Sequence, residues 1–239
     1  MNGLVLNNLK SASQTFEEEG ILFFPKLLAG AELDRLRVAC EYVLERYRAH
    51  VDAHTPSLRD FPSMRLLEEP IWHPETQEHR LLLMEIIADP RFLGAAEQAF
   101  DGRSLYRSST LFFNPRFESN EGDWHRDLQF LVKDEEELKA RIGRQRAGGI
   151  QLQIALIDND DIEYVPFSAG RYDSPEEYYI RAADNRAHNR EAGMPGAMRI
   201  PLRAGDAIIV NANGLHRGRY LVDNPRADGY HRGARRRRG

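Results

Sequence analysis

The sequence predicts an α+β fold that is mainly β, with helices first and an antiparallel β-sandwich or barrel after them. Apolar residues recur at helical spacing through much of the first hundred residues. From Ser104 the chain instead divides into short β-rich runs bounded by Gly, Asn, Asp or Pro, which is typical of antiparallel β folds. A helical insertion interrupts these runs.

The first part of the chain contains several predicted helices. In the stretch SQTFEEEG, a serine or threonine start, acidic residues in the first turn and a stop at Gly20 predict the first helix, and Ile21–Phe24 suits a short strand. Apolar residues near helical spacing predict a strong amphipathic helix over about 30–49. We expect further helices near 77–88 and over 91–100. The prolines within 51–76 predict a loop.

Seven β-rich runs follow. The insertion between the fourth and fifth runs is expected to form a helix to about 189, because Ser174 can cap it, Pro175 suits its first position and Glu177 completes a capping box. The seven runs are SLYRSSTLFFNP, GDWHRDLQFLV, GGIQLQIALI, IEYVPFS, GAMRIPL, GDAIIVNAN and LHRGRYLV.

A single domain over 1–239 is the expected organisation, with a helical part over about 1–100, a β core over about 104–226 and a basic tail over 227–239. The net charge of −4 gives no field that would attract nucleic acid, and the arginines at 235–238 are expected to form a solvated end. One cysteine excludes an internal disulfide. Neither a signal peptide nor a membrane span is evident, so a cytoplasmic protein is the simplest interpretation.

His125 and Asp127 form the motif with most chemical content. Residues i and i+2 of a strand project from the same face, so the two side chains would point together. Taken alone, such a pair is more often two polar residues facing solvent. His216 is flanked by strand sequence and can supply a third ligand. Two histidines and a carboxylate form the facial triad that holds Fe(II), although zinc fits the same donors. The remaining histidines are expected on the surface.

Several segments together resemble the phytanoyl-CoA dioxygenase superfamily of Fe(II)- and 2-oxoglutarate-dependent oxygenases. The likeness runs from the N-terminal segment to about Arg226 and implies a double-stranded β-helix, or jelly roll. It further implies that His125, Asp127 and His216 hold iron, with 2-oxoglutarate and O2 as co-substrates. The matching segments are FEEEGILFFPKLLAGAELDRLR, WHRDLQF, GIQLQIAL, DDIEYVP and PLRAGDAIIVNANGLHRGRY.

The resemblance also implies a cationic clamp for the distal carboxylate of 2-oxoglutarate. Family members carry an arginine ten or eleven residues beyond the second histidine, and Arg226 lies ten residues after His216. The planar fork of arginine suits two charge-assisted hydrogen bonds to one carboxylate. Arg219 is the alternative clamp. Gln153, with Gln151 on the same face of its strand, either lines the pocket or faces water.

The reaction implied by the resemblance is oxidation of a C–H bond of a small molecule, with release of succinate and CO2. Halogenating members replace the carboxylate ligand with a small residue. This chain keeps Asp127, which favours hydroxylation, desaturation or ring formation.

Two departures from the family pattern bear on function. Phe167–Tyr172 replaces a Gly-Ser-His segment that borders the substrate mouth in relatives, so we expect Arg171, Tyr172 and Tyr178 to face substrate. Beyond Arg226 the family pattern has a hydrophobic final strand, whereas this chain reads ADGYHRGARRRRG. The alternative function is therefore a catalytically silent jelly-roll protein that binds a ligand. The sequence gives no prediction of oligomeric state.

Overall fold

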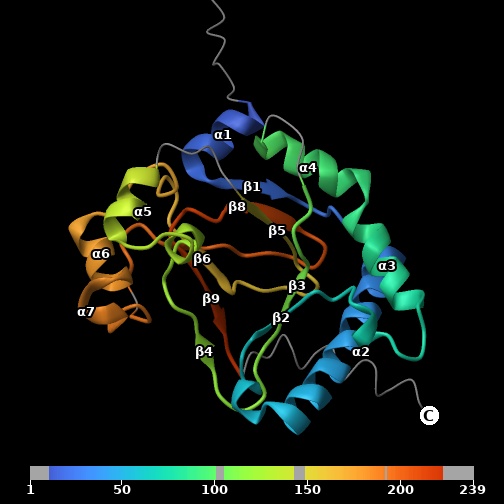
Figure 1. Ribbon diagram of the computed structural model, residues 1–239. Helices are drawn as coiled ribbons and strands as arrows, with labels where there is room; N and C mark the ends of the chain where they lie inside the picture. The colour runs from blue at the N-terminus through green and yellow to red at the C-terminus, as the bar shows by residue number, and fades with distance from the viewer. Residues whose placement is uncertain (1–10, 101–104, 143–148, 192, 223–239) are drawn as a thin grey trace, which may run out of the picture.

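The computed structural model describes residues 11–100, 105–142, 149–191 and 193–222. Its helices lie around the β-sheets (Figure 1). The α-helices are α1 Ala12–Glu19, α2 Gly30–His54, α3 Glu78–Ile87, α4 Pro90–Phe100, α5 Glu135–Arg141, α6 Pro175–Arg181 and α7 Ala183–Arg186, and the 3₁₀ helices are η1 Pro56–Leu58, η2 Pro70–Trp72 and η3 Asp127–Phe130. The strands are β1 Ile21–Phe24, β2 Ser63–Arg65, β3 Thr110–Phe112, β4 Asn120–Glu121, β5 Ile150–Ile154, β6 Ile162–Tyr164, β7 Met198–Arg199, β8 Ala207–Asn211 and β9 His216–Tyr220.

Local sequence signals set the ends of two helices, although the first helix begins earlier than expected. Ser11 and Gln14 form a capping box at the start of α1, and Gly20 ends that helix in the left-handed conformation with φ 80°. Ser174 and Glu177 form the predicted capping box of α6, with Pro175 at its first position. The predicted start of the first helix within SQTFEEEG was too late, and its first turn holds no acidic residue. The stop at Gly20 and the start of α6 are confirmed, because both follow from short-range hydrogen bonds.

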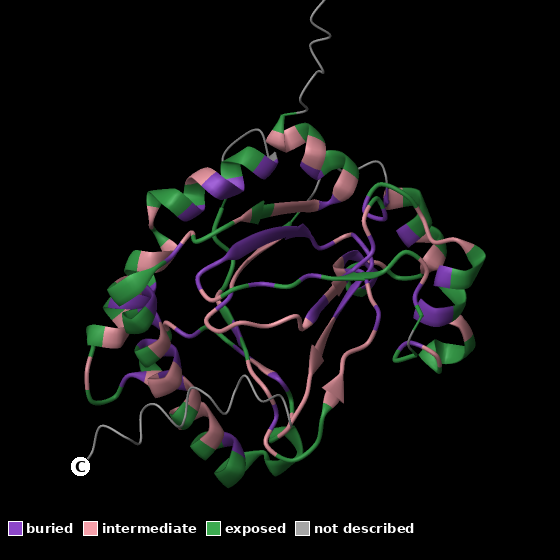
Figure 2. Ribbon diagram, turned by 180° about the vertical axis from the view of Figure 1, so that it is seen from behind, coloured by how far each residue is buried: buried purple, intermediate pink, exposed green. Residues whose placement is uncertain are grey.

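The strands pair antiparallel in two main sheets. One has the order β1-β8-β5 and the other β4-β9-β6-β7, while β2 and β3 form a separate pair. All five residues of β8 are buried, and Figure 2 shows this strand in purple across the centre of the molecule. The uninterrupted apolar run of β8 thus matches its position between β1 and β5, where both faces of the strand are covered.

Each face of β8 packs against a different layer. Ile209 joins Phe16 of α1 and two alanines of α4 on one face. On the other face, Ile208 and Val210 pack with residues of β6, including Tyr164, so this core lies between the two main sheets. The alternation of side chains along a strand therefore divides the apolar run between a helix-covered face and the interior.

The N-terminal helices build a further core. Leu33, Leu36 and Val43 of α2 pack with Leu82 of α3 and with Met64 of β2. The α2 helix ends at His54, five residues beyond the predicted end. The predicted loop over 51–76 therefore begins with helix and also contains β2. Two of its four prolines, Pro56 and Pro70, stand at the first positions of η1 and η2.

Two sequence predictions about the β region were wrong, and one helix was missed. Residues 122–132 do not form a continuous strand, because only His125 makes a bridge to the sheet and η3 begins at Asp127. The inserted helix ends at Arg181, and Asp184 and Asn185 then adopt left-handed φ angles of 49° and 57°. The α5 helix was not predicted, although Asp134 caps it and acidic residues fill its first turn.

The region after residue 222 lies outside the described residues. Arg226, the atypical final segment and the basic tail are therefore known from sequence alone. Within the part of the chain that the structure describes, no helix combines the length and apolarity needed to cross a membrane.

The prediction of a surface position for His73 was wrong. His73 is fully buried, and its Nε2 is 2.8 Å from the Leu67 carbonyl oxygen.

Candidate metal centre

The three predicted ligands come together where the chain passes from the bridge between His125 and His216 into η3. The backbones of His125 and His216 exchange hydrogen bonds of 3.1 and 3.0 Å, so their side chains project from the same side of the sheet. The amide of Asp127 donates to the Ala212 carbonyl at 2.8 Å and fixes the first turn of η3 beside them. Asp127 thus reaches the site from a helical turn and not from the strand position that the sequence predicted.

The donor atoms of the triad converge on one point. Asp127 Oδ1 lies 3.4 Å from His125 Nε2 and 3.6 Å from His216 Nε2. One donor atom of each residue lies within 4.8 Å of the others. The His125 ring and the Asp127 carboxylate are partly exposed, whereas the His216 side chain is 8% exposed, so the site is open on one side.

Hydrogen bonds at Nδ1 leave the Nε2 atom of each imidazole available to a metal ion. His125 Nδ1 is 2.7 Å from the Asp123 carbonyl oxygen, and His216 Nδ1 is 2.9 Å from that of Gly214. A ring nitrogen that faces a carbonyl must carry the proton, so each Nε2 keeps a lone pair. Burial, followed by the nearby charge of His125, lowers the pKa of His216 to about 4. His216 is therefore a neutral imidazole at neutral pH.

The carboxylate of the triad is held ionised. Burial would raise the pKa of Asp127, but the adjacent imidazoles of His125 and His216 and the hydrogen bond from Gln151 bring its net pKa below the ordinary value. Gln151 Nε2 donates to Asp127 Oδ2 at 3.1 Å, and Gln153 Nε2 donates to Gln151 Oε1 at 3.0 Å. Two imidazoles and one oriented carboxylate fit a divalent iron centre with coordination positions left open.

The profile of one protein family matches this chain from residue 16 to residue 220, and its description is phytanoyl-CoA dioxygenase. This span includes both main sheets and all three triad residues. The chain belongs to the phytanoyl-CoA dioxygenase family. The family relationship that the sequence motifs indicated is thereby confirmed.

Individual relatives support the same fold. The ectoine dioxygenase of Halomonas elongata is 28% identical over 162 residues, which are 62% of this chain and 42% of that protein. The carbocyclase SnoK from nogalamycin biosynthesis, described as non-heme and α-ketoglutarate dependent, has a TM-score of 0.58 at 18% identity, covering 91% of this chain and 80% of SnoK. HygX from Streptomyces hygroscopicus, solved with nickel and 2-oxoglutarate bound, has a TM-score of 0.54 at 16% identity, covering 86% and 79%.

Arg219, the alternative co-substrate clamp, does not join the triad. His216 and Arg219 stand three residues apart on β9, so strand alternation directs their side chains to opposite faces. The Arg219 guanidinium pairs with Glu121 at 2.6 Å and approaches Glu163 at 3.5 Å. This phytanoyl-CoA dioxygenase family member therefore uses Arg219 to join β4, β6 and β9 on the face away from the metal centre.

The three predicted substrate residues cluster between α5 and α6. Both terminal nitrogens of Arg171 donate to the Glu177 carboxylate at 2.6 Å, and the Tyr172 hydroxyl donates to Glu135 at 2.7 Å. The Tyr178 ring lies 6.5 Å from that of Tyr172 and is partly exposed. The polar atoms of Arg171 and Tyr172 are thus engaged by protein partners.

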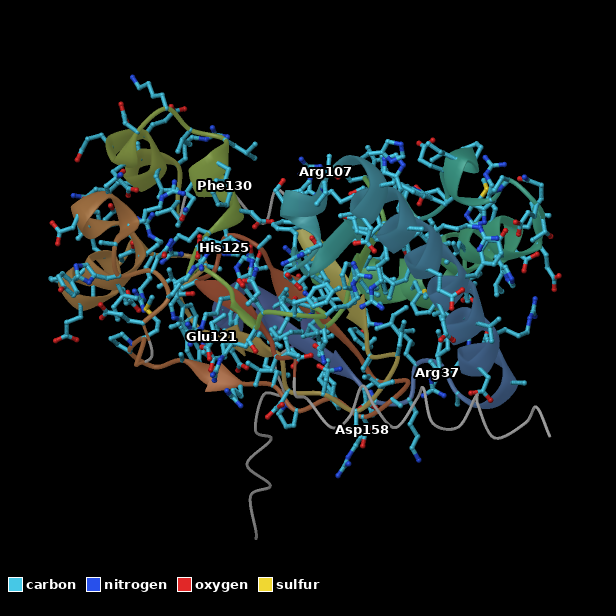
Figure 3. All side chains as sticks on the ribbon, turned by 90° about the horizontal axis from the view of Figure 1, so that it is seen from below. Arg37, Arg107, Glu121, His125, Phe130 and Asp158 are labelled. Atoms are coloured by element: carbon cyan, nitrogen blue, oxygen red, sulfur yellow. The ribbon has the colours of Figure 1, made fainter. Side chains whose placement is uncertain are left out.

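Two residues of the centre escaped the sequence predictions. Phe130 is 59% exposed and its ring centroid lies 5.7 Å from that of His125. Both residues are labelled in Figure 3. Arg126 stands between two ligands in the sequence and is fully buried. An aromatic residue three positions after Asp127 is a signal that the sequence offers for Phe130. Arg126 offers no such signal, because its contacts join segments distant in sequence.

Proposed function

We propose that this protein is an Fe(II)- and 2-oxoglutarate-dependent oxygenase that hydroxylates or otherwise oxidises a C–H bond of a small molecule. The observation that carries the proposal is the convergence of two imidazole Nε2 atoms and one ionised carboxylate in a chain of this family. When bound, Fe(II) and 2-oxoglutarate supply the reducing equivalents for O2 activation. The hydroxylation converts 2-oxoglutarate, O2 and R–H into succinate, CO2 and R–OH.

The residues of the chain would have distinct tasks. His125, Asp127 and His216 would hold the metal on one side, and Gln151 would keep the carboxylate turned toward it. Arg226 is our proposed clamp for the distal carboxylate of 2-oxoglutarate, on the basis of its spacing from His216. Two antiparallel sheets around a shared core support a jelly roll, and we infer a single domain.

The substrate would approach from the open side of the triad. Phe130 would offer an apolar surface next to His125, since the residue is more than half exposed. Tyr178 would offer an exposed ring. Arg171 and Tyr172 would contribute to the shape of the substrate site and not bind substrate through their polar groups, because these groups already pair with Glu177 and Glu135 between α5 and α6.

The decisive experiment is anaerobic titration of the iron-loaded protein with 2-oxoglutarate. A weak visible charge-transfer band is expected for the wild type and is lost in His216→Ala. His54→Ala is the matched control, because His54 is an exposed histidine of α2 outside the triad, and its band should persist. Succinate release in air, screened over a panel of small molecules, then tests turnover.

Other outcomes would favour other functions. A chelate band without any succinate release would indicate a ligand-binding protein that has lost turnover. Zinc in the purified protein, with activity that survives without O2, would indicate a hydrolase. Absence of the band, with no change on substituting His216, would reject the oxygenase proposal.

A further inference from the structure

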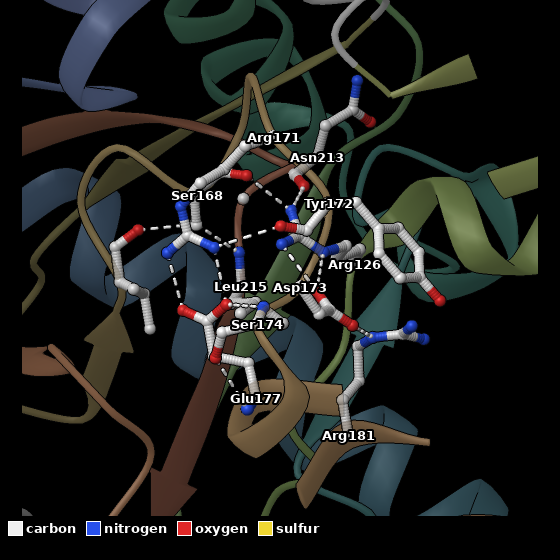
Figure 4. A network of polar contacts seen from close by, with 12 residues as sticks. Arg126, Ser168, Arg171, Tyr172, Asp173, Ser174, Glu177, Arg181, Asn213 and Leu215 are labelled. Atoms are coloured by element: carbon white, nitrogen blue, oxygen red, sulfur yellow. Dashed lines mark hydrogen bonds and ion pairs between the residues drawn. The ribbon is translucent and has the colours of Figure 1, made fainter. Parts of the chain in front are cut away.

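Arg126 occupies an unusual position, because it lies between the ligands His125 and Asp127 while its own side chain points into the protein. Its side chain is 0% exposed. Nη1 donates to the carbonyl oxygens of Ser168 and Asn213, each at 2.7 Å (Figure 4). One guanidinium therefore joins the segment carrying the first two ligands to the turn that precedes the third.

The guanidinium of Arg126 is itself fixed by a buried carboxylate. Nε donates to Asp173 Oδ1 at 2.8 Å, and Asp173 Oδ2 accepts from Arg181 Nε at 2.5 Å. Arg181 continues to Glu135 of α5 at 2.6 and 3.0 Å. Gln129 Oε1 accepts from the Arg126 amide at 3.1 Å and from Arg181 at 3.2 Å. Positive and negative side chains alternate along this series of contacts, so each buried charged group has a partner of opposite charge.

Ser168 adds a second connection to the third ligand. Its hydroxyl donates to the Val165 carbonyl at 2.6 Å and accepts from the Leu215 amide at 2.8 Å. Leu215 directly precedes His216, and Asn213 lies three residues before it. The residues just before His216 are thus held at two points. Arg126 binds the Asn213 carbonyl, and Ser168 binds the Leu215 amide.

We propose that Arg126 is a positioning residue for the metal centre, and that Asp173, Arg181 and Glu135 extend its support to α6 and α5. In this arrangement the insertion is part of the structure that sets the distance between the ligand segments. Lysine could replace the charge of Arg126, but it lacks the planar fork that reaches a carboxylate and two carbonyls at once. The inference rests on the proposed function only in taking the triad as the metal site.

Metal affinity is the direct test, measured without turnover. Co(II) is titrated into the metal-free protein under anaerobic conditions, with visible absorption as one readout and the metal-induced rise in Tm as the other. We expect Arg126→Gln to bind Co(II) about 10- to 100-fold more weakly, the range typical for partners of metal ligands. Arg126→Lys should fall between this variant and the wild type.

Two further variants separate positioning from folding. Val43→Ala removes buried atoms from α2, away from the triad, and should lower the Tm of the metal-free protein without weakening Co(II) binding. The double variant Arg126→Gln with Asp173→Asn removes both charges of the Arg126–Asp173 pair while Arg181 keeps its contacts with Glu135, and should recover part of the lost Tm. Its Co(II) affinity should nevertheless stay low, because the contacts with Ser168 and Asn213 are still missing.

The possible results discriminate sharply. Wild-type Co(II) affinity in Arg126→Gln, or in the double variant, would overturn the positioning role. An equal loss of affinity in Val43→Ala would also overturn it, because general destabilisation would then explain the effect. Undiminished Co(II) binding in His216→Ala would instead refute the metal site and with it the proposed function.

Discussion

Gln151 Nε2 donates a 3.1 Å hydrogen bond to Oδ2 of Asp127, whereas the Nε2 atoms of both histidines approach Oδ1. The carboxylate is thus held through one oxygen and presents the other to the metal position. Gln153 supports Gln151 from two residues away on β5. The sequence placed both glutamines on one face, and the structure shows that this face points to the triad.

Substitution of Gln151 should loosen the carboxylate. We expect Gln151→Leu to weaken Co(II) binding about 10-fold, because partners of metal ligands typically contribute 10- to 100-fold. Gln153→Leu should have a smaller effect, since Gln153 acts only through Gln151. Spectroscopic Co(II) titration of both variants checks this order. A larger loss in Gln153→Leu would contradict it.

The two candidate clamps should behave differently. Arg226→Gln is expected to raise the Kd for 2-oxoglutarate, measured by the anaerobic chelate band. Arg219→Gln should leave that Kd unchanged and lower the free energy of unfolding by about 0.5–1 kcal/mol, because its ion pairs are partly exposed. Loss of 2-oxoglutarate binding in Arg219→Gln would show that this arginine, and not Arg226, serves as the clamp.

Two glycine substitutions should change stability in opposite directions. A Cβ on Gly214 would overlap the hydroxyl and ring of Tyr164, so Gly214→Ala should lower the free energy of unfolding by about 1–3 kcal/mol. A Cβ on Gly94 in α4 meets no atom within 4 Å. Gly94→Ala should therefore stabilise the helix by about 0.5–1 kcal/mol. Urea unfolding of both variants measures the difference, and destabilisation by Gly94→Ala would argue against the open position.

The Glu177 carboxylate should make stability depend on pH. Burial would raise its pKa, but hydrogen bonds from Arg171 and the Ser174 amide bring the net pKa below the ordinary value. A depressed pKa stabilises the folded state above the unfolded pKa, and this contribution is lost as the pH falls through the folded value. At pH 7, Glu177→Gln should cost about 1.5–3 kcal/mol.

The effect of Glu177→Gln should decrease as the pH falls from the unfolded-state pKa of about 4.3 through the lower folded-state pKa, where the buried carboxylate takes up a proton. Urea unfolding of the wild type and the variant across pH 3–7 measures this convergence. A difference in unfolding free energy that stays constant over the whole range would show that the ionised carboxylate is not the stabilising group.

Signals close together in the sequence were sufficient for several elements. Ser174 with Glu177 predicted where α6 begins, because capping depends on residues three positions apart, and Gly20 predicted where α1 ends. The identities of the triad residues were also evident, since their residue types and order match the family motifs. The family assignment followed from these segments and was confirmed over residues 16–220.

Only the tertiary structure decided how the ligands meet. Asp127 was expected on a strand but begins η3, because its amide bonds to Ala212, 85 residues away in the sequence. Arg126 gave no sequence signal for the same reason, since Ser168, Asp173 and Asn213 come from other segments. The sequence determined which residues can bind a metal. Contacts between distant segments decided their geometry, because a hydrogen bond depends on distance in space and not on separation along the chain.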